Sequence, residues 1–213
     1  MMLKKILLIC GIVSSLVYIG TDIIAAMSLE GYSYINSAVS ELTAIGAPTR
    51  SFVIPLYIVY NALMIAFGIG VCWSANRKRA LRITGILLAT HGAFGLITQL
   101  SPMFSMSPRG AEGALNDIIH LVVMGVIVLL ILGCIGFGAA AGGKWFRLYS
   151  IATILIMLVF GALSGMQGHK IAAGLPTPWF GVIERVDVYF PLLWVLVLAI
   201  VLLRSQDAEP KIT

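Results

Sequence analysis

The chain has 213 residues, of which 60% are hydrophobic and 11% are charged, and its formal net charge at pH 7 is +5. A soluble domain carries roughly 25% charged residues, and the mean hydropathy here is +1.01, so the composition excludes an ordinary soluble protein. It also gives no support for nucleic-acid binding, because no cluster of Lys and Arg is interleaved with aromatic residues as that function needs.

Six apolar runs of about 20 residues are each long enough to cross about 30 Å of hydrocarbon. The sequence therefore predicts an all-α integral membrane protein, with residues 1–213 forming one transmembrane domain built as a six-helix bundle. The predicted spans are residues 6–27, 52–74, 83–100, 117–140, 148–166 and 187–204. The first run resembles a signal peptide, but its length, its interruption by Asp22 and the lack of a small-residue cleavage site favour an uncleaved helix.

The connection between the first two predicted spans is unusually polar and reads YINSAVSELTAIGAPTR at residues 34–50. Its apolar residues recur at helical spacing on one face, and its polar residues follow the same spacing on another. The apolar set is Ile35, Ala38, Val39 and Leu42, and the second set is Ser37, Ser40, Glu41 and Ala44. The pattern predicts a short amphipathic interfacial helix at about residues 35–45, which ends at Gly46-Ala47-Pro48.

This interfacial helix has two interpretations. It either seals one end of the bundle as a plug, or it covers a polar pocket lined by Ser40 and Glu41. In the second case Arg50 serves as a counter-charge or as an anion contact.

Lys and Arg residues are distributed unevenly between the two sides of the predicted spans. Ten of the fourteen fall on the side of the termini: Lys4, Lys5, Arg77, Lys78, Arg79, Arg82, Lys144, Arg147, Arg204 and Lys211. Because cytoplasmic loops are enriched in Lys and Arg, we expect a plasma-membrane protein with both termini in the cytoplasm. Four residues then face outside, namely Arg50, Arg109, Lys170 and Arg185.

Acidic residues and histidines gather toward that outer side. The acids are Asp22, Glu30, Glu41, Glu112, Asp117, Glu184 and Asp187, and the histidines are His91, His120 and His169. The outer connections are also the longer ones, and long connections in compact folds are often functional. The polar chemistry of the protein is therefore expected on the extracytoplasmic side.

Ionisable residues at bilayer depth are costly and usually have a partner inside the bundle. At 1.5 Å per residue, Asp22, His91 and His120 lie roughly 8, 12 and 5 Å below the outer ends of their spans, which allows one cluster. Asp22 is expected to pair with Arg185, Arg50 or a histidine. Asp117 and His120 are spaced i, i+3, so the carboxylate can orient the imidazole. The predicted ligand-binding residues are Asp22, Ser40, Glu41, Arg50, His91, Asp117, His120, Glu184 and Arg185.

Several of these residues also have a purely structural interpretation. Asp117, Glu184 and Asp187 fall in or near the first turns of predicted spans, where acids complement the helix dipole. His91 can serve to hydrogen-bond a neighbouring helix, and His169, beside Lys170, fits a solvated loop.

Two segments together resemble a known family. These are Ser40-Glu41-Leu42 through Gly46-Ala47-Pro48-Thr49-Arg50, and GVIERVDVYFPLLWVLVLAIVLLR at residues 181–204. They resemble the domain-of-unknown-function 998 family of bacterial and archaeal multi-pass membrane proteins, and the similarity spans most of the chain. The resemblance implies an all-helical membrane fold of about six spans and no established activity.

Three functions follow as hypotheses. The first is an outward-facing polar pocket that binds a lipid headgroup or small amphiphile, or that assists another membrane protein. The second is a membrane-embedded hydrolase or transferase acting on a lipid-linked substrate, with Glu41, Asp117, His120 and His91 as acid–base candidates. The third is a small proton-linked transporter that uses Asp22 and His91. Whether the protein is an enzyme is left open by the sequence.

Three histidines also invite the hypothesis of a metal-dependent hydrolase. Their spacing differs from that of the alkaline ceramidase and adiponectin-receptor superfamily, because the last predicted span here has no histidine. No metal and no other cofactor is therefore predicted. The expected partners are membrane lipids, with a membrane protein or a second copy of the chain as further possibilities.

Overall fold

The computed structural model describes residues 2–111 and 115–207. Six long helices account for most of these ranges, which contain no strand. The long helices are α1 (Met2–Ser28), α2 (Arg50–Ser74), α3 (Arg79–Gln99), α4 (Leu115–Ala141), α5 (Lys144–Gly165) and α7 (Phe180–Asp207). The short elements are the 3-10 helices η1 (Val39–Thr43) and η2 (Pro102–Phe104) and the one-turn helix α6 (Gly168–Ala172).

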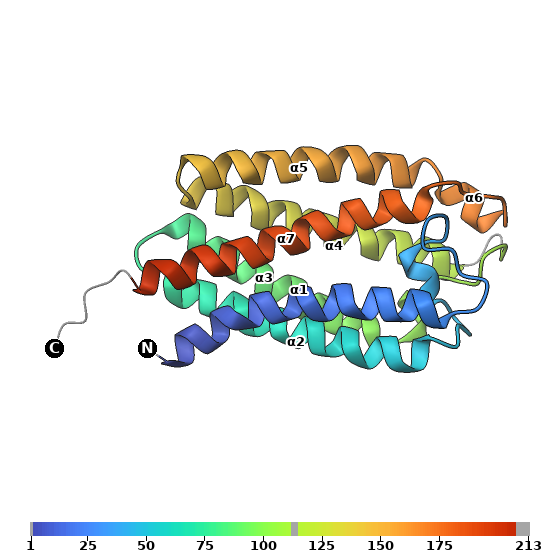
Figure 1. Ribbon diagram of the computed structural model, residues 1–213, viewed down its shortest axis with the longest axis horizontal. Coiled ribbons are helices and arrows are strands. Elements are labelled where there is room, and N and C mark those ends of the chain that lie inside the picture. Colours follow the sequence, from blue (N-terminus) through green and yellow to red (C-terminus); the bar gives the residue numbers. More distant parts are fainter. Residues whose placement is uncertain (1, 112–114, 208–213) are drawn as a thin grey trace.

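Each of the six long helices is long and apolar enough to cross a membrane. The protein is therefore a multi-pass membrane protein, and the predicted all-helical fold with six spans is confirmed. Because the number of spans is even, α1 begins and α7 ends at the same end of the bundle (Figure 1). The three connections with the short elements meet at the other end. We call this end the cap, defined by residues 29–49, 100–111 and 166–179.

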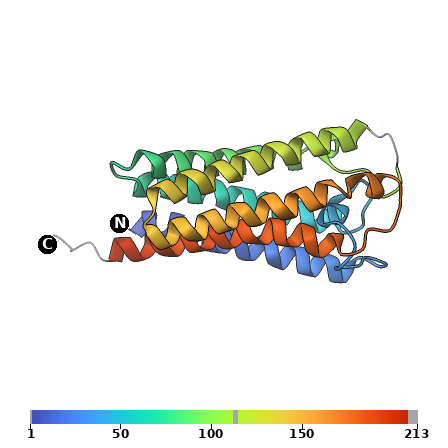
Figure 2. The ribbon, with the colours of Figure 1, turned by 90° about the horizontal axis from the view of Figure 1, so that it is seen from above.

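Consecutive helices from α1 to α5 pack against each other, and α7 returns to pack on α1 and α5. Figure 2 shows all six long helices following one common axis. The largest fully buried side chain is Trp194 of α7. Its indole N–H donates to the hydroxyl oxygen of Ser150 on α5 at 2.9 Å, so the bulky ring is buried without an unsatisfied donor.

The spans α2 and α3 approach each other closely at two glycines. A Cβ atom at Gly68 would lie 2.6 Å from the carbonyl oxygen of Gly85, and one at Gly85 would lie 2.7 Å from that of Gly68. Small residues at a membrane helix interface let the two backbones approach each other in this way. These two glycines therefore fix the spacing of α2 and α3.

The interfacial element is shorter than the sequence predicts. In place of a helix at about residues 35–45, the structure has the five-residue 3-10 helix η1. Ala38, Val39 and Leu42 are buried as the amphipathic pattern requires, but Ile35 is 47% exposed. The carboxylate of Glu41 accepts a hydrogen bond from the backbone N–H of Ala38 at 2.7 Å, which starts the turn there rather than earlier.

The last span begins earlier than predicted, at Phe180 rather than at residue 187. Glu184 and Asp187 are therefore the fifth and eighth residues of α7, and the interpretation that they occupy its first turn is wrong. Asp117 does lie in the first turn of α4, as predicted. The helix dipole accordingly accounts for Asp117 alone among these three acids.

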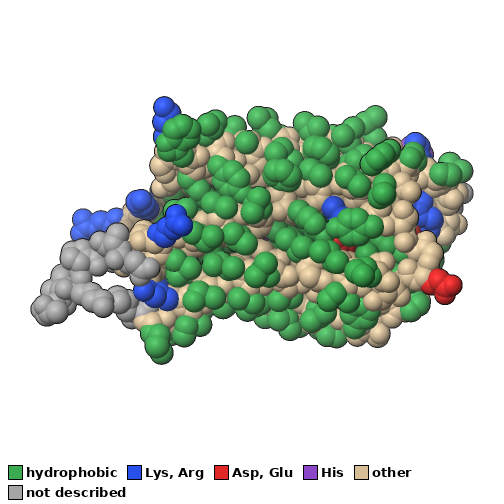
Figure 3. Space-filling view, in the orientation of Figure 1, with side chains coloured by type: hydrophobic (Ala, Val, Ile, Leu, Met, Phe, Trp, Pro, Cys, Tyr) green, Lys and Arg blue, Asp and Glu red, His purple; other side chains and the backbone are tan. Residues whose placement is uncertain are grey.

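Hydrophobic side chains cover the bundle along its length in Figure 3, and Lys and Arg side chains gather at the end opposite the cap. The spans differ in how much of their surface the protein itself covers. In the most apolar window of each span, 17% of residues are buried in the α5 region and 22% in α4, against 33–39% in the other four. The α4 and α5 side is therefore the one most open to lipid or to another protein.

Candidate functional site: the polar cap

A buried ion pair joins α1 to α7 just below the cap. The carboxylate of Asp22 accepts hydrogen bonds from Nε of Arg185 at 2.8 Å and from Nη2 at 2.9 Å. The Asp22 side chain is fully buried, and that of Arg185 is 4% exposed. The Tyr189 hydroxyl donates a short hydrogen bond to the same carboxylate. Arg185 is thus the partner of Asp22, one of those expected from the sequence.

The remaining donors of Arg185 hold the first cap connection. Nη1 donates to the carbonyl oxygens of Tyr34 at 2.8 Å and Gly181 at 3.2 Å, and Nη2 donates to the Tyr32 hydroxyl at 2.8 Å. A guanidinium group has five N–H donors, and all five are used here. The guanidinium also lies 3.6 Å from the ring centroid of Tyr34.

Tyr32 connects this ion pair to the start of η1. Its hydroxyl accepts from Arg185 and donates to the carbonyl oxygen of Ala38 at 2.9 Å. Burial raises the pKa of Tyr32, although the neighbouring Arg185 acts in the opposite direction. The phenol is therefore neutral at physiological pH, as its role as a donor to Ala38 requires.

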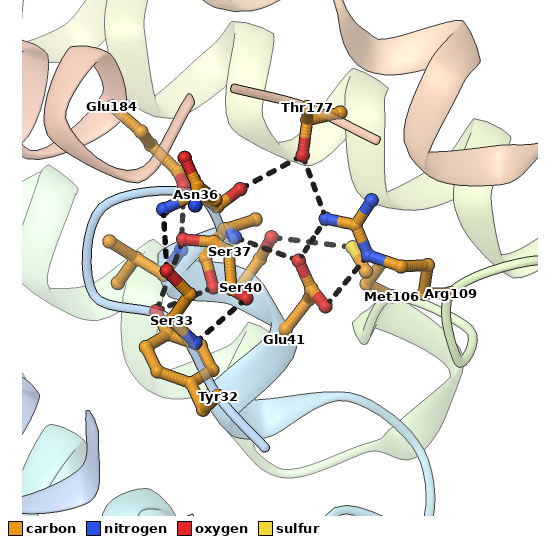
Figure 4. A network of polar contacts seen from close by, with 12 residues as sticks. Tyr32, Ser33, Asn36, Ser37, Ser40, Glu41, Met106, Arg109, Thr177 and Glu184 are labelled. Atoms are coloured by element: carbon orange, nitrogen blue, oxygen red, sulfur yellow. Dashed lines mark hydrogen bonds and ion pairs between the residues drawn. The ribbon is translucent and has the colours of Figure 1, made fainter. Parts of the chain in front are cut away.

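A second ion pair lies within the cap itself (Figure 4). The Arg109 guanidinium forms two hydrogen bonds with the Glu41 carboxylate, Nη2 to Oε1 at 2.7 Å and Nε to Oε2 at 3.1 Å. Arg109 also donates to the carbonyl oxygen of Leu175 at 3.0 Å and to the hydroxyl of Thr177 at 3.1 Å. The Thr177 hydroxyl in turn donates to the carbonyl oxygen of Asn36 at 2.8 Å. This cluster ties all three cap connections together.

Glu184 and Asp117 bind backbone N–H groups of the cap. A carboxylate oxygen of Glu184 accepts from the N–H of Val39 at 2.6 Å, at the start of η1. The carboxylate of Asp117 accepts from the N–H of Ser107 at 2.8 Å. Both side chains thus supply acceptors for buried cap residues, whose backbone donors would otherwise be costly to leave unpaired.

His120 and Ser40 also hold the connection between α3 and α4. Nδ1 of His120 lies 3.0 Å from the carbonyl oxygen of Phe104, and the Ser40 hydroxyl lies 3.3 Å from the sulfur of Met106. His120 and Asp117 share a face of α4, but each contacts a different residue of that connection. Among the described residues, therefore, no hydrogen bond shows this carboxylate orienting this imidazole.

His91 lies away from the cap residues. It is 7% exposed, and its Nε2 lies 3.2 Å from the Tyr60 hydroxyl on α2. Its Nδ1 has no hydrogen-bond partner among the described residues. His91 therefore hydrogen-bonds a neighbouring helix, as one interpretation of the sequence proposes, and it does not join Asp22 and His120 in one cluster.

Arg50 is the first residue of α2 and lines a groove beside the cap. Its Nη1 donates to the carbonyl oxygen of Thr43 and, at 2.7 Å, to the hydroxyl of Ser105. Its Nε and Nη2 make no hydrogen bond to any residue in the described ranges. The Arg50 side chain also forms no ion pair with a described residue. The groove has a volume of about 460 Å³ and is lined by Ala47, Arg50, Ser51, Ile54 and Pro55.

Most predicted site residues are thus brought together at the cap, but they contact each other and the backbone rather than an open pocket. Within residues 2–111 and 115–207, no three side chains of His, Cys, Asp or Glu gather closely enough to hold a metal ion. Arg50 is the predicted residue that keeps charged hydrogen-bond donors facing a groove.

The family of the chain is shown by its sequence. Residues 12–201 match the model of the family described as "Protein of unknown function (DUF998)". The chain belongs to the DUF998 family. The match runs from Ile12 in α1 to Val201 in α7, so both ion pairs and the Arg50 groove lie inside the DUF998 region. No curated protein and no solved structure matches the chain.

Sequence reasoning missed several residues of the DUF998 cap. Arg109 and Thr177 complete the Glu41 cluster, and Tyr32, Tyr34 and Tyr189 complete the surroundings of Arg185. A signal was present in the sequence for Arg109, because it is one of the four basic residues predicted on the side of the acids. No comparable signal marked the tyrosines, which also occur commonly at membrane interfaces for their amphipathic rings.

Proposed function

We propose that the protein binds the anionic headgroup of a membrane lipid in the groove beside Arg50. The single observation that carries this proposal is the difference among the three arginines of the cap region. Arg185 makes five hydrogen bonds and Arg109 makes four, and each faces a carboxylate. Arg50 makes two, both to neutral oxygens of described residues. Its remaining donors suit a phosphate group, which guanidinium binds with matching geometry.

The position of the groove favours a lipid over a soluble anion. Arg50 and Ser51 open α2 at the cap, and Ile54 and Pro55 continue the groove one turn further into the span. A lipid can therefore place its phosphate at Arg50 while an acyl chain follows the apolar residues. The N-terminus of the 25-residue helix α2 adds a favourable field for an anion at the same place.

Lipid binding can be tested by native mass spectrometry of the detergent-solubilised protein titrated with phosphatidylglycerol or phosphatidylcholine. We expect a preference for phosphatidylglycerol that Arg50→Gln lowers about tenfold, since one charge-assisted hydrogen bond contributes about 1.5–3 kcal/mol. Arg50→Lys should retain part of the preference, because the charge stays while the planar geometry is lost.

The matched control is Arg204→Gln, which removes one positive charge from the opposite end of the bundle. If Arg204→Gln and Arg50→Gln weaken binding equally, attraction by net charge explains the preference and the proposed site is wrong. Inorganic phosphate added to the titration distinguishes a site for a lipid phosphate from a site for a free phosphate ion. It should not displace the lipid if the apolar part of the groove contributes to binding.

We also infer an orientation in the plasma membrane, with both termini in the cytoplasm and the cap outside. The support is that nine Lys and Arg residues of the described ranges lie at the end opposite the cap, which agrees with the enrichment of these residues in cytoplasmic loops. A fluorescent reporter that matures only in the cytoplasm, fused to the C-terminus, should fluoresce. A dark fusion protein of normal abundance would contradict this orientation.

The enzyme and transporter hypotheses draw less support from the contacts of their candidate residues than lipid binding does. Glu41 and Asp117, two of the acid–base candidates of the enzyme hypothesis, accept hydrogen bonds from Arg109 and from backbone N–H groups. Asp22, the centre of the transport hypothesis, is held by Arg185. No observation on the described residues favours either activity over lipid binding.

A further inference from the structure

Asp187 is an acid at bilayer depth without a partner in the described part of the chain. It is the eighth residue of α7, about 10 Å below the cap end of that helix at 1.5 Å per residue. Its half-buried carboxylate makes no hydrogen bond or ion pair with any residue of 2–111 or 115–207. Glu184 and Asp22, at similar depth, are both satisfied. Ionisable residues at such depth usually have a partner.

The backbone provides a second acceptor at the same place. Pro191 lies inside α7, four residues after Asp187. Proline has no N–H, so the carbonyl oxygen of Asp187 loses the helical hydrogen bond that residue 191 would otherwise donate. Two acceptors of one residue, the carboxylate and the carbonyl, thus lack their usual donors.

The facing surface of α5 presents a glycine rather than a hydrogen-bond donor to the carboxylate. A Cβ atom at Gly161 would lie 3.5 Å from both carboxylate oxygens of Asp187, so a glycine opposes the acid. Close by on α5, Ala162 and Gly165 are exposed, and nothing lies within 4 Å of a Cβ placed at Gly165. Small exposed residues of this kind let another helix approach closely in a membrane.

We propose that the surface of α5 and α7 around Asp187 docks a transmembrane helix of another protein that carries Lys or Arg at the matching depth. An ammonium group has three donors, which is enough for the carboxylate and the carbonyl oxygen of Asp187 together. The Asp187 carboxyl group has no counter-ion among the described residues, and the α5 region is the least covered of the six spans. The partner is thus defined by a buried cation on an otherwise apolar helix.

A second copy of the chain does not supply this cation. Arg185, which lies at similar depth, already uses all five of its donors within its own chain. A two-fold dimer would use this same surface on both copies, so Asp187 of one copy would approach Asp187 of the other. Neither Asp187 carboxyl group could supply the cation that the other lacks.

The test uses the full chain in phosphatidylcholine vesicles, with a fluorescent donor fused to its C-terminus. The probe is a synthetic Leu/Ala helix of about 21 residues with an acceptor dye and one Lys about seven residues from its end, compared with the same helix carrying Leu there. Energy transfer should report an apparent Kd about three- to tenfold lower for the Lys helix, the range expected for a polar interhelical contact.

The variants assign that preference to the site. Asp187→Asn should abolish the preference for Lys, and Asp187→Glu should retain it. The control Glu30→Gln removes an exposed acid at the cap and should leave the preference unchanged. Equal energy transfer for the Lys and Leu helices with the natural protein would overturn the proposal. So would a preference that survives Asp187→Asn.

Discussion

The two ion pairs near the cap have similar geometry but different surroundings. Asp22–Arg185 joins two membrane spans, and its side chains are 0% and 4% exposed, whereas Glu41–Arg109 joins two connecting segments with 16% and 26% exposed. Each pair has two guanidinium hydrogen bonds to one carboxylate. The difference shows that the first pair makes charges tolerable at bilayer depth, while the second orders loops in competition with water.

The largest effect on the free energy of unfolding is expected when the buried ion pair is broken. Asp22→Asn should lower the free energy of unfolding by about 3–5 kcal/mol, because Arg185 would keep a buried charge without its counter-ion. The measurement is equilibrium unfolding in detergent micelles followed by circular dichroism. The double variant Asp22→Asn, Arg185→Gln should recover part of the loss, since the uncompensated charge is then removed as well.

A loss below about 0.5 kcal/mol, the usual effect of a surface substitution, would contradict this account of the buried pair. The control Glu30→Gln removes an acid from the same end of the molecule without touching an ion pair. It should leave the unfolding midpoint nearly unchanged.

The same comparison shows what the sequence could predict. The six spans follow from the length of apolar runs, so their number was predicted correctly. The start of α7 was predicted too late, because the polar residues Glu184 and Arg185 interrupt the apolar run. Their partners, Val39 and Asp22, lie more than 140 residues away in the sequence. A hydropathy profile contains no information on such partners.

Depth along a helix indicates which residues lie at the same level of the bundle, but not which of them make contact. Asp22 was expected to pair with Arg185, Arg50 or a histidine, and in the structure its partner is Arg185. Depth also suggested that His91 joins Asp22, but rotation about the helix axis decides which neighbour a side chain meets, and His91 faces Tyr60. Glu41 lies in the 3-10 helix η1, but Arg109 lies in an irregular connection 68 residues further along the chain, so their pairing was not predictable from spacing.

A smaller effect on the free energy of unfolding is expected at Tyr32, which connects the buried ion pair to the cap. Tyr32→Phe removes the hydroxyl that accepts from Arg185 and donates to Ala38. The loss should be about 2 kcal/mol, because one buried guanidinium N–H is left without an acceptor. The variant keeps the ring, so lost packing does not explain a measured difference.

The pH dependence sharpens this prediction. Burial raises the pKa of Tyr32 in the folded protein above its ordinary value of about 10. Above about pH 10 the unfolded chain loses the phenolic proton while the folded chain keeps it, so the folded state loses stability as pH rises. The stability difference between the natural protein and Tyr32→Phe should therefore shrink between pH 8 and pH 11. Parallel curves over this range would contradict the raised pKa.

The smallest effect is expected from the exposed pair. Arg109→Gln should lower the free energy of unfolding by about 1 kcal/mol, since water and side-chain entropy offset much of the attraction in a partly exposed pair. Salt separates the two pairs, because the screening length falls from about 10 Å at 0.1 M to about 3 Å at 1 M. The loss caused by Arg109→Gln should shrink over this range of salt, while that caused by Asp22→Asn should stay constant. Equal salt dependence would mean that water reaches Asp22, and the distinction between a buried and a solvated ion pair would then fail.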